Sequence, residues 1–585
     1  MVKRSSALVA VVAACVIAAP AQARTAANPF GLSVVRFANG TTPAQMRTAV
    51  AQAGGVVVTD LSPIGALVVV PASLSFGSRI QADRHVTAAF ADSVVTPSPR
   101  KDGELSAPGP NGDQDPPGRP TRSFPDPWHD AASFWNVTNP EGILQWDDAR
   151  MDVPAAWAQT LGDPGIRVAV VDSGVDGSHR ELHPNFDQRD SVNEIPCKEL
   201  AREVGRDALK AAGLWDCSDR DTDGHGTWVA SRIAGAANGF ASNGVAPQVQ
   251  ITSYKVLATG FGGLSSWIIA GILDACSHGA DIVNLSLGTY LDPNNPLDAE
   301  EYRLWADAVD YCHARGAAVF AAAGNDHVRV DRSDLTIDGR RFRGAGIVTD
   351  GAQGIGTVVP GSPTTDDFDL RGLLVVPAGV PGVVMVSATN NANGQAPAGV
   401  PLRWLDHVGA RDQLAYYSSF GSRIDLAAPG GARRYNIPRY DGGPGDILYG
   451  GWGSLGALVA SGALCTDPVI GSPDTFACFK VAGNAFGWLQ GTSMAVPNAV
   501  GVAALTLSAH PELRGRPDDL VARLERRARR NLVNFMGPND PRNTAPSLRG
   551  VACDTGYCHV DRTHAIAFGD AYGAGLVDAG AAVAP

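Results

Sequence analysis

The sequence predicts an α/β protein with a doubly wound, mostly parallel sheet, preceded by a small α+β domain of ferredoxin-like order. Two observations predict the large part. From residue 166 to residue 388, short apolar runs typical of strands alternate with segments typical of helices, the order that produces a parallel sheet. One of these runs, 166–171, is almost continuously apolar, as in a strand that is buried on both faces.

The chain begins with a segment that we expect to be removed. Lys3 and Arg4 precede an apolar run at 7–19, and small residues end the segment, so residues 1–23 are interpreted as a signal peptide for secretion. The sequence around Cys15 also resembles a bacterial lipobox, which would anchor the protein through a lipid on that cysteine. Simple secretion is favoured because the apolar run continues past Cys15 to a suitable cleavage site.

Residues 24–95 are expected to form the small domain. They contain strand patterns at 32–37, 56–61, 66–70 and 86–91, and helix patterns at 43–53 and 74–82. This βαββαβ order is typical of a ferredoxin-like domain. Residues 96–142 follow as a linker or processing region, because Pro, Gly and Asp are frequent there as far as Pro127.

Residues 143–585 are expected to form the large domain. Its strands are expected at 166–171, 250–256, 281–286, 317–320 and 383–388. Its helices are expected after His225 and at 265–277 and 301–315. Hydrophobic residues make up 44% of the chain, which is enough for an extensive core.

The charge balance gives no support for nucleic acid or anionic membrane partners, because the net charge is -12. The basic cluster Arg523–Arg530 follows Asp518 and Asp519, and acidic residues at the start of a helix with arginines at its end match the helix dipole. This cluster is therefore expected to be a solvated helix face. We expect a monomer without a membrane span beyond the signal peptide.

Three glycine-rich segments, far apart in the chain, each contain one chemically useful side chain. Asp172 ends the strand pattern at 166–171, where open α/β sheets place their sites. His225 stands between two glycines before a helix pattern, and Ser493 opens an apolar helix pattern. A serine in the first turn of a helix has a backbone N–H without a helical partner, which can bind an oxyanion.

The three segments, in the order Asp, His, Ser, resemble those of the subtilisin-like serine proteases, the subtilases (peptidase S8 family). The order differs from that of chymotrypsin-like and α/β-hydrolase chains, and Ala495 stands where the hydrolase elbow needs a glycine. The resemblance implies that Asp172, His225 and Ser493 are a catalytic triad. It further implies that Asn325, in the segment AAAGN, is the oxyanion-hole residue.

The resemblance also assigns roles to other parts of the chain. Ser286, Leu287 and Gly288 match the strand end that pairs with the substrate backbone. Residues 24–95 resemble the family's propeptide, which assists folding and inhibits the active site until it is cleaved. Gln145–Trp146 and residues 153–157 resemble the start of the mature domain.

The implied function is a secreted serine endopeptidase that acts on proteins and peptides. It needs no cofactor for catalysis. An esterase, an exopeptidase or a processing protease of narrow specificity would use the same acyl-transfer chemistry. A binding protein without activity would not need the four residues together.

Compared with compact family members, the chain has insertions near 191–218, 327–375 and 431–486. They would line the cleft or form peripheral loops. The acidic run Asp219, Asp221 and Asp223 is interpreted as either a solvated turn or a structural calcium site.

Eight cysteines remain after the signal peptide, an even number that suits an oxidising compartment. The local pairs are Cys197 with Cys217, Cys465 with Cys478, and Cys553 with Cys558. Cys276 and Cys312 are left as a fourth bridge or two buried thiols.

Overall fold

A computed structural model describes residues 28–95, 145–211, 215–350, 370–391, 412–415, 417–432, 453–466, 478–532 and 566–585 of the chain. The expected signal peptide with Cys15, the whole linker at 96–142, and Cys553 and Cys558 lie outside the described residues.

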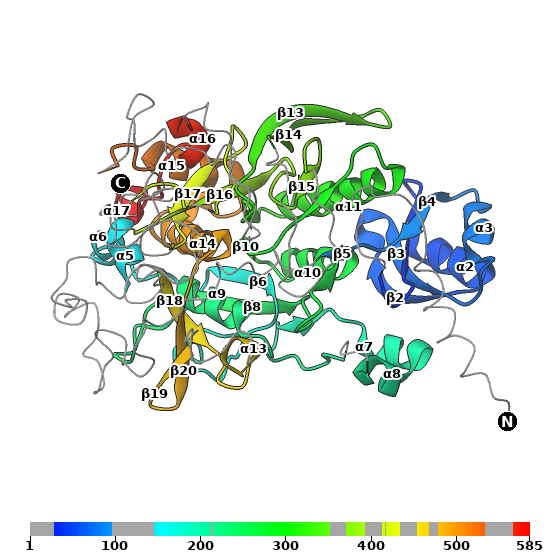
Figure 1. Cartoon of the computed structure of the whole chain (residues 1–585), viewed down its shortest axis with the longest axis horizontal. Helices are drawn as coiled ribbons and strands as arrows, with labels where there is room; N and C mark the ends of the chain where they lie inside the picture. The colour runs from blue at the N-terminus through cyan, green and yellow to red at the C-terminus, as the bar shows by residue number, and fades with distance from the viewer. Residues whose placement is uncertain are drawn as a thin grey trace, which may run out of the picture.

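The small domain has one four-stranded antiparallel sheet, in the order β2, β3, β1, β4. Its elements follow the βαββαβ order expected from the sequence: β1 (Ser33–Phe37), α2 (Pro43–Ala53), β2 (Gly55–Leu61), η1 (Ser62–Ile64), β3 (Ala66–Pro71), α3 (Phe76–Gln81) and β4 (Val86–Ala91). Helix α2 begins where it does because Thr42 and Gln45 form a capping box and Pro43 occupies the first turn. The domain lies at one end of the molecule (Figure 1).

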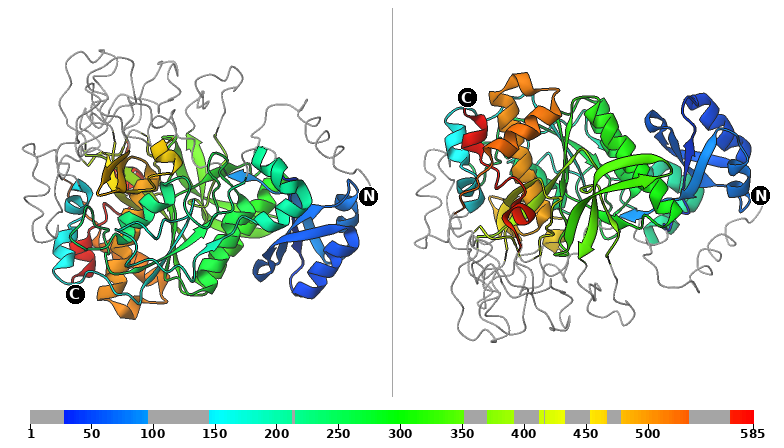
Figure 2. Two further views of the ribbon diagram at one scale, coloured as in Figure 1. Left: turned by 90° about the horizontal axis from the view of Figure 1, so that it is seen from below. Right: turned by 90° about the horizontal axis from the view of Figure 1, so that it is seen from above.

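The small domain rests on two helices of the large domain. Strand β5 (Val94–Val95), which ends the small domain, pairs antiparallel with β9 (Gly263–Leu264). Ser265 N donates to the carbonyl of Ser93 at 2.9 Å, and Arg36 forms an ion pair with Asp307 at 2.6 Å. Both views in Figure 2 place the blue small domain against this side of the large one.

Seven strands of the large domain form one sheet in which every neighbouring pair is parallel. Across the sheet they are β17 (Leu426–Pro429), β16 (Val383–Thr389), β12 (Ala318–Ala322), β10 (Ile282–Leu285), β6 (Arg167–Asp172), β8 (Gln250–Lys255) and β7 (Val192–Asn193). After β6 the chain forms β7 and β8 on one side of it and then returns across β6 to β10, so the strand order reverses between β6 and β10. Open α/β sheets bind ligands at the carboxyl ends of strands beside such a reversal.

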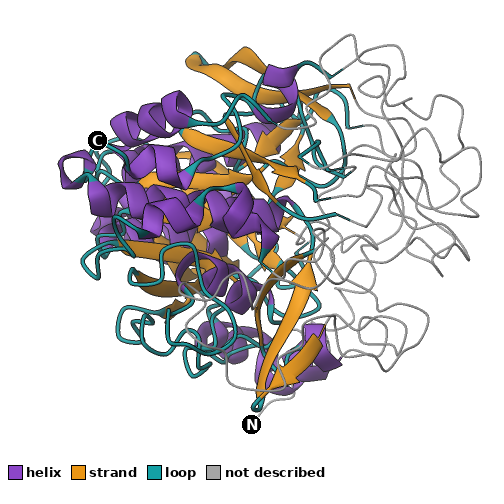
Figure 3. Cartoon of the chain, turned by 90° about the vertical axis from the view of Figure 1, so that its left-hand side faces the viewer, coloured by secondary structure: helices purple, strands orange, loops and turns teal. Residues whose placement is uncertain are grey.

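The strands are apolar on both faces because each face is covered by helices. The covering helices are α9 (His225–Ala234), α10 (Ser265–Ser277), α11 (Pro296–His313) and α14 (Thr492–Ala509). Val168 and Val170 of β6 belong to the core that contains α9 and α14, whereas Ala169 and Val171 belong to the core that contains α10 and α11. The predicted doubly wound α/β fold is therefore confirmed, and Figure 3 shows the helices packed against the strands.

The large domain also contains α5 (Trp146–Arg150), α6 (Val153–Trp157), the 3₁₀ turn η3 (Pro511–Leu513), α15 (Pro517–Arg527), α16 (Phe568–Tyr572) and α17 (Ala579–Val583). Within the described residues, α14 alone has the length and apolar character of a membrane span, and 89% of it is buried inside the protein. It is the central helix of one core.

The expected insertions have structure of their own where they are described. The elements in these stretches are α7 (Cys197–Leu200), η2 (Ala201–Gly205), α8 (Arg206–Ala211), β13 (Arg329–Ile337), β14 (Arg340–Asp350), β18 (Ser454–Leu458), α13 (Ala463–Thr466), β19 (Cys478–Val481) and β20 (Asn484–Leu489). Strands β13 and β14 form a hairpin, and with β15 (Leu374–Val376) and β11 (Thr289–Leu291) they make a second, four-stranded sheet in the order β11, β15, β14, β13. It projects at the top of Figure 1.

Three disulfides link described cysteines. Cys197–Cys217 and Cys465–Cys478 are two of the local pairs suggested by the sequence, with Cα–Cα distances of 5.7 Å and 5.2 Å. Cys276–Cys312 joins α10 to α11 at a Cα–Cα distance of 5.2 Å, so these two residues form a bridge and not two thiols.

Candidate active site

Asp172 and His225 meet at the carboxyl end of β6. The Nδ1–H of His225 donates to Asp172 Oδ1 at 2.7 Å. Asp172 is completely buried, whereas 13% of the His225 side chain is exposed. Because the carboxylate fixes the proton on Nδ1, Nε2 of the neutral ring is an acceptor that can take up a further proton.

The start of α9 is held closely against the segment that follows β6. Gly226 N donates to Ser173 Oγ at 2.9 Å, which ties the first turn of α9 to the residue after Asp172. A Cβ on Gly226 would lie only 2.1 Å from the carbonyl oxygen of Gly174. The glycine after His225 is therefore required by this close approach of two backbone segments.

Asp221 organises the same loop from inside. Its Oδ1 accepts from Ser173 Oγ at 3.0 Å and from the backbone N–H groups of Asp223 and Gly224 at 2.9 Å. Its Oδ2 accepts from Thr227 N at 3.0 Å and Thr227 Oγ1 at 2.6 Å. Burial raises the pKa of Asp221 to about 6. The carboxylate thus connects the segment after Asp172 with the start of α9.

The interpretation of the acidic run as a solvated turn is correct for Asp219 alone. Asp219 is exposed, as a solvated turn would be, but Asp221 and Asp223 are only 3% and 5% exposed. Among the described residues, no group of three or more His, Cys, Asp or Glu side chains is arranged to hold a metal ion. The oxygens of Asp221 are engaged by protein donors.

Ser493 lies in the first turn of α14 and is 4% exposed. Its hydroxyl donates to the carbonyl oxygen of Ser286 at 3.0 Å. In return, Ser286 Oγ donates to the carbonyl oxygen of Ser493 at 2.9 Å. The serine is thus fixed beside the end of β10, the strand next to β6.

Asn325 follows β12, the next strand in the sheet. Its Oδ1 accepts from Thr492 N at 2.9 Å and from Thr492 Oγ1 at 2.8 Å, so the amide group is oriented by the residue before Ser493. A Cβ placed on Gly491 would lie 3.5 Å from Asn325 Nδ2 and 3.6 Å from Ser493 N. These two N–H donors therefore border the same small space, as the donors of an oxyanion hole do.

Residues 286–288 extend from the end of β10 beside Ser493. They lie outside every sheet ladder of the described structure, and Gly288 is half-buried. Ser286 and Leu287 are 3% and 2% exposed, so contact with a peptide would be made through their backbone. β9 is a second backbone segment near the site: Leu257, in the turn that leads to it, donates its N–H to the carbonyl of Asp172 at 3.2 Å.

The insertion at 431–486 supports the His225 loop where it is described. Ala463 N and Leu464 N donate to the carbonyls of Thr222 and Asp223 at 3.0 Å and 2.9 Å. The Cys465–Cys478 bridge pins this segment to β19. A segment pinned by a disulfide therefore lies directly beside the loop that carries a catalytic candidate.

Sequence reasoning did not find Thr492, Asp221 or β9. Thr492 lies within the motif that identified Ser493, and its hydroxyl was the available signal. Asp221 was visible only as part of an acidic run, because its burial depends on segments that are distant in sequence. β9 has just two residues, too few for a strand pattern.

The parallel sheet, the reversal between β6 and β10, and the Asp, His, Ser and Asn side chains at its carboxyl edge are the architecture of a subtilisin-like peptidase. Residues 163–543 match the Subtilase family, Peptidase S8. The chain belongs to the subtilase family.

Known proteins of this family align with a large part of the chain. It is 26% identical to Subtilisin of Bacillus pumilus over 372 residues, which are 64% of this chain and 86% of that protein. It is also 26% identical to Subtilisin NAT of Bacillus subtilis subsp. natto over 372 residues, or 64% of this chain. That alignment spans 62% of Subtilisin NAT, slightly less than two thirds of its length.

Solved structures share the fold. The crystal structure of the epidermin leader peptide processing serine protease of Staphylococcus aureus matches with a TM-score of 0.58 at 18% identity, covering 94% of this chain and 97% of that one. Fervidolysin of Fervidobacterium pennivorans matches with a TM-score of 0.52 at 19% identity, covering 95% of this chain and 61% of that one.

Proposed function

We propose that the protein is a secreted serine endopeptidase in which Ser493 is the nucleophile, His225 the general base and Asp172 its orienting partner. The observation that carries the proposal is the buried Asp172–His225 hydrogen bond of 2.7 Å, at the same sheet edge as Ser493. Export is supported by the three disulfides and by the similarity to the minor extracellular protease Epr of Bacillus subtilis, 27% identical over 291 residues.

The proposed reaction is acyl transfer. Ser493 Oγ turns from the carbonyl of Ser286 toward His225 Nε2, loses its proton to that nitrogen and attacks the scissile carbonyl carbon. The resulting oxyanion accepts hydrogen bonds from Asn325 Nδ2 and Ser493 N. The imidazolium then gives its proton to the leaving amine, and water releases the acyl group by the reverse sequence. This chemistry requires no metal or organic cofactor.

Two backbone segments are proposed to hold the substrate, residues 286–288 on one side and β9 on the other. An extended peptide can add to such segments through its own N–H and C=O groups. The pairing of Val94 and Val95 with β9 is an intramolecular example of this mode.

The same pairing supports the proposal that the small domain is an inhibitory propeptide. Its last described strand pairs with β9, which follows the Leu257 contact with Asp172, and the expected processing region begins at residue 96. Phe30 packs against Phe261 and Trp267 with ring centroids at 5.7 Å and 5.6 Å, so the contact includes an apolar anchor as well as the strand. Cleavage within residues 96–142 would separate the two parts.

A peptide-library cleavage profile of the purified mature enzyme tests the function, with Ser493→Ala measured in parallel. We expect internal cleavage by the parent and loss of nearly all activity in the variant. Undiminished hydrolysis by Ser493→Ala would refute the nucleophile, and release only from chain ends would refute the endopeptidase assignment.

A further inference from the structure

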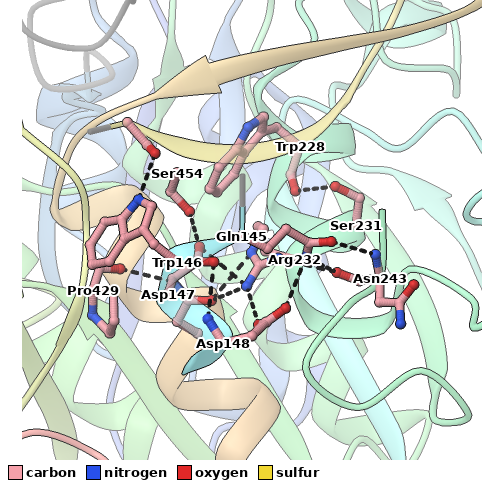
Figure 4. Close-up of polar contacts among 12 residues, drawn as sticks. Gln145, Trp146, Asp147, Asp148, Trp228, Ser231, Arg232, Asn243, Pro429 and Ser454 are labelled. Atoms are coloured by element: carbon pink, nitrogen blue, oxygen red, sulfur yellow. Dashed lines mark hydrogen bonds and ion pairs between the residues drawn. The ribbon is translucent and has the colours of Figure 1, made fainter. Parts of the chain in front are cut away.

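A buried charged cluster lies behind the candidate active site, where the first turn of the large domain meets two helices (Figure 4). Its cation is Arg232 of α9, which is 1% exposed. Arg232 Nη2 lies 3.2 Å from Asp147 Oδ2 and 2.7 Å from Asp148 Oδ1, both on α5. The cluster is separate from Asp172, His225 and Ser493, yet it contacts the helices that carry two of them.

The same guanidinium joins α9 to α14. Its Nη2 and Nε donate to Asn498 Oδ1 at 2.9 Å and 3.3 Å, and Asn498 Nδ2 donates to the carbonyl of Pro429 at 2.8 Å. Asn498 is completely buried. His225 is the first residue of α9 and Ser493 the second of α14, so Arg232 is seven residues after one and Asn498 five after the other. At about 3.6 residues per turn, the link lies about two turns from His225 along α9 and about one and a half turns from Ser493 along α14.

The carboxylates hold the guanidinium in place. Ser454 Oγ donates to Asp147 Oδ2, and Gln145 Nε2 donates to Asp148 Oδ2 at 2.9 Å. Arg232 Nη1 is satisfied by the carbonyl of Asn243 at 3.1 Å. Every nitrogen of the guanidinium therefore has a partner, and its fork is fixed in one orientation.

We infer that Arg232 is a positioning residue: through Asn498 it holds the helix that begins at His225 in register with the helix that carries Ser493, while Asp147 and Asp148 seat it. This inference rests on the proposed function. Asp147 and Asp148 lie on α5, the first described helix after the proposed processing region. The alignment of α9 with α14 therefore depends on the position of α5.

Arg232→Lys in the full-length protein, allowed to process itself, tests the inference. Lysine keeps the positive charge beside the carboxylates but, as a compact ammonium, lacks the separate Nε and Nη1 donors that reach Asn498 and the carbonyl of Asn243. Asn498→Ala removes the other side of the link and leaves the ion pairs intact. Both variants should lower kcat per active site by about 10- to 100-fold with little change in KM, because a displacement near 1 Å has effects of this size.

Active sites are counted by titration with an acylating inhibitor, which separates slow enzyme from unfolded enzyme. The double variant should be no slower than the slower single variant, because both changes break the same link. Arg423→Lys is the matched control, since Arg423 is also a buried arginine paired with an aspartate, Asp425, and it contacts neither α9 nor α14 in the described structure.

Parental kcat per titrated site in both single variants, or additive losses in the double variant, would overturn the inference and leave Arg232 a stabilising residue only. Ser493→Ala, measured in the same series, keeps the two proposals apart. Full activity in that variant would refute the proposed function whatever the Arg232 variants show.

Discussion

Replacing Gly226 by alanine should separate His225 from Asp172. The added Cβ would lie 2.1 Å from the carbonyl oxygen of Gly174 and 3.2 Å from Asp172 Cβ. A carbon and an oxygen normally approach to about 3.3 Å, so the start of α9 must move by about 1.2 Å, which is 3.3 minus 2.1. The atom in the way belongs to the backbone, so no side chain can rotate to relieve the contact.

The expected effect is a loss of about 100-fold in kcat, because a misplacement near 1 Å in the reacting groups has that cost. The measurement is the hydrolysis rate of a chromogenic peptide ester by Gly226→Ala, divided by the titrated active sites. Gly569→Ala is the matched control, since no atom lies within 4 Å of its added Cβ. An unchanged kcat in Gly226→Ala would refute the claim that this contact sets the position of His225.

Three further predictions concern single side chains. Asn325→Leu should lower kcat by about 100- to 1000-fold with KM nearly constant, the range for one lost oxyanion donor, and an equal rise in KM would contradict this role. Met494→Ala should lose activity in peroxide more slowly than the parent, since sulfoxide at this buried position would crowd the oxyanion site. Burial, with a smaller contribution from Glu301, raises the pKa of Asp92 to about 7 at the contact with α10. In the released segment the pKa of Asp92 returns toward 3.8, so binding of the segment takes up a proton. Inhibition by segment 24–95 added in trans should therefore weaken as the pH rises, by up to about tenfold per pH unit from about pH 4 to pH 7. Asp92→Asn should flatten this dependence, and an unchanged slope would exclude Asp92 as its source.

The elements that carry the site could be predicted because their signals are local. The apolar run that ends at Asp172 and the expected helix at 265–277 contain the whole pattern within a few residues, and the structure has α10 at Ser265–Ser277. Helix α11 begins at Pro296, five residues before the expected start at 301, because the side chain of Asn295 caps it by accepting from Leu297 N. The cap Asn295 and the first-turn residue Asp298 are polar, so they add nothing to the apolar pattern from which the helix was predicted.

The supporting polar groups could not be predicted because their partners are distant in sequence. Arginine is a residue type that is seldom fully buried, and the partners that bury Arg232, Asp148 and Asn498, are 84 and 266 residues away. The same holds for the insertion at 453–466, whose contacts with the His225 loop exist only in the folded chain. Such groups are found only when the fold brings the segments together.

The Cys276–Cys312 bridge has a consequence for the order in which the molecule is assembled. It joins α10 and α11, the two helices on which the small domain rests, and closes a loop of 36 residues. In the chain-entropy model, such a cross-link removes roughly 4 kcal/mol of freedom from the unfolded chain. Once this disulfide has formed, α10 and α11 are already held together, so less of the free energy of binding the small domain is lost in ordering them. The two helices also stay together after the small domain has left.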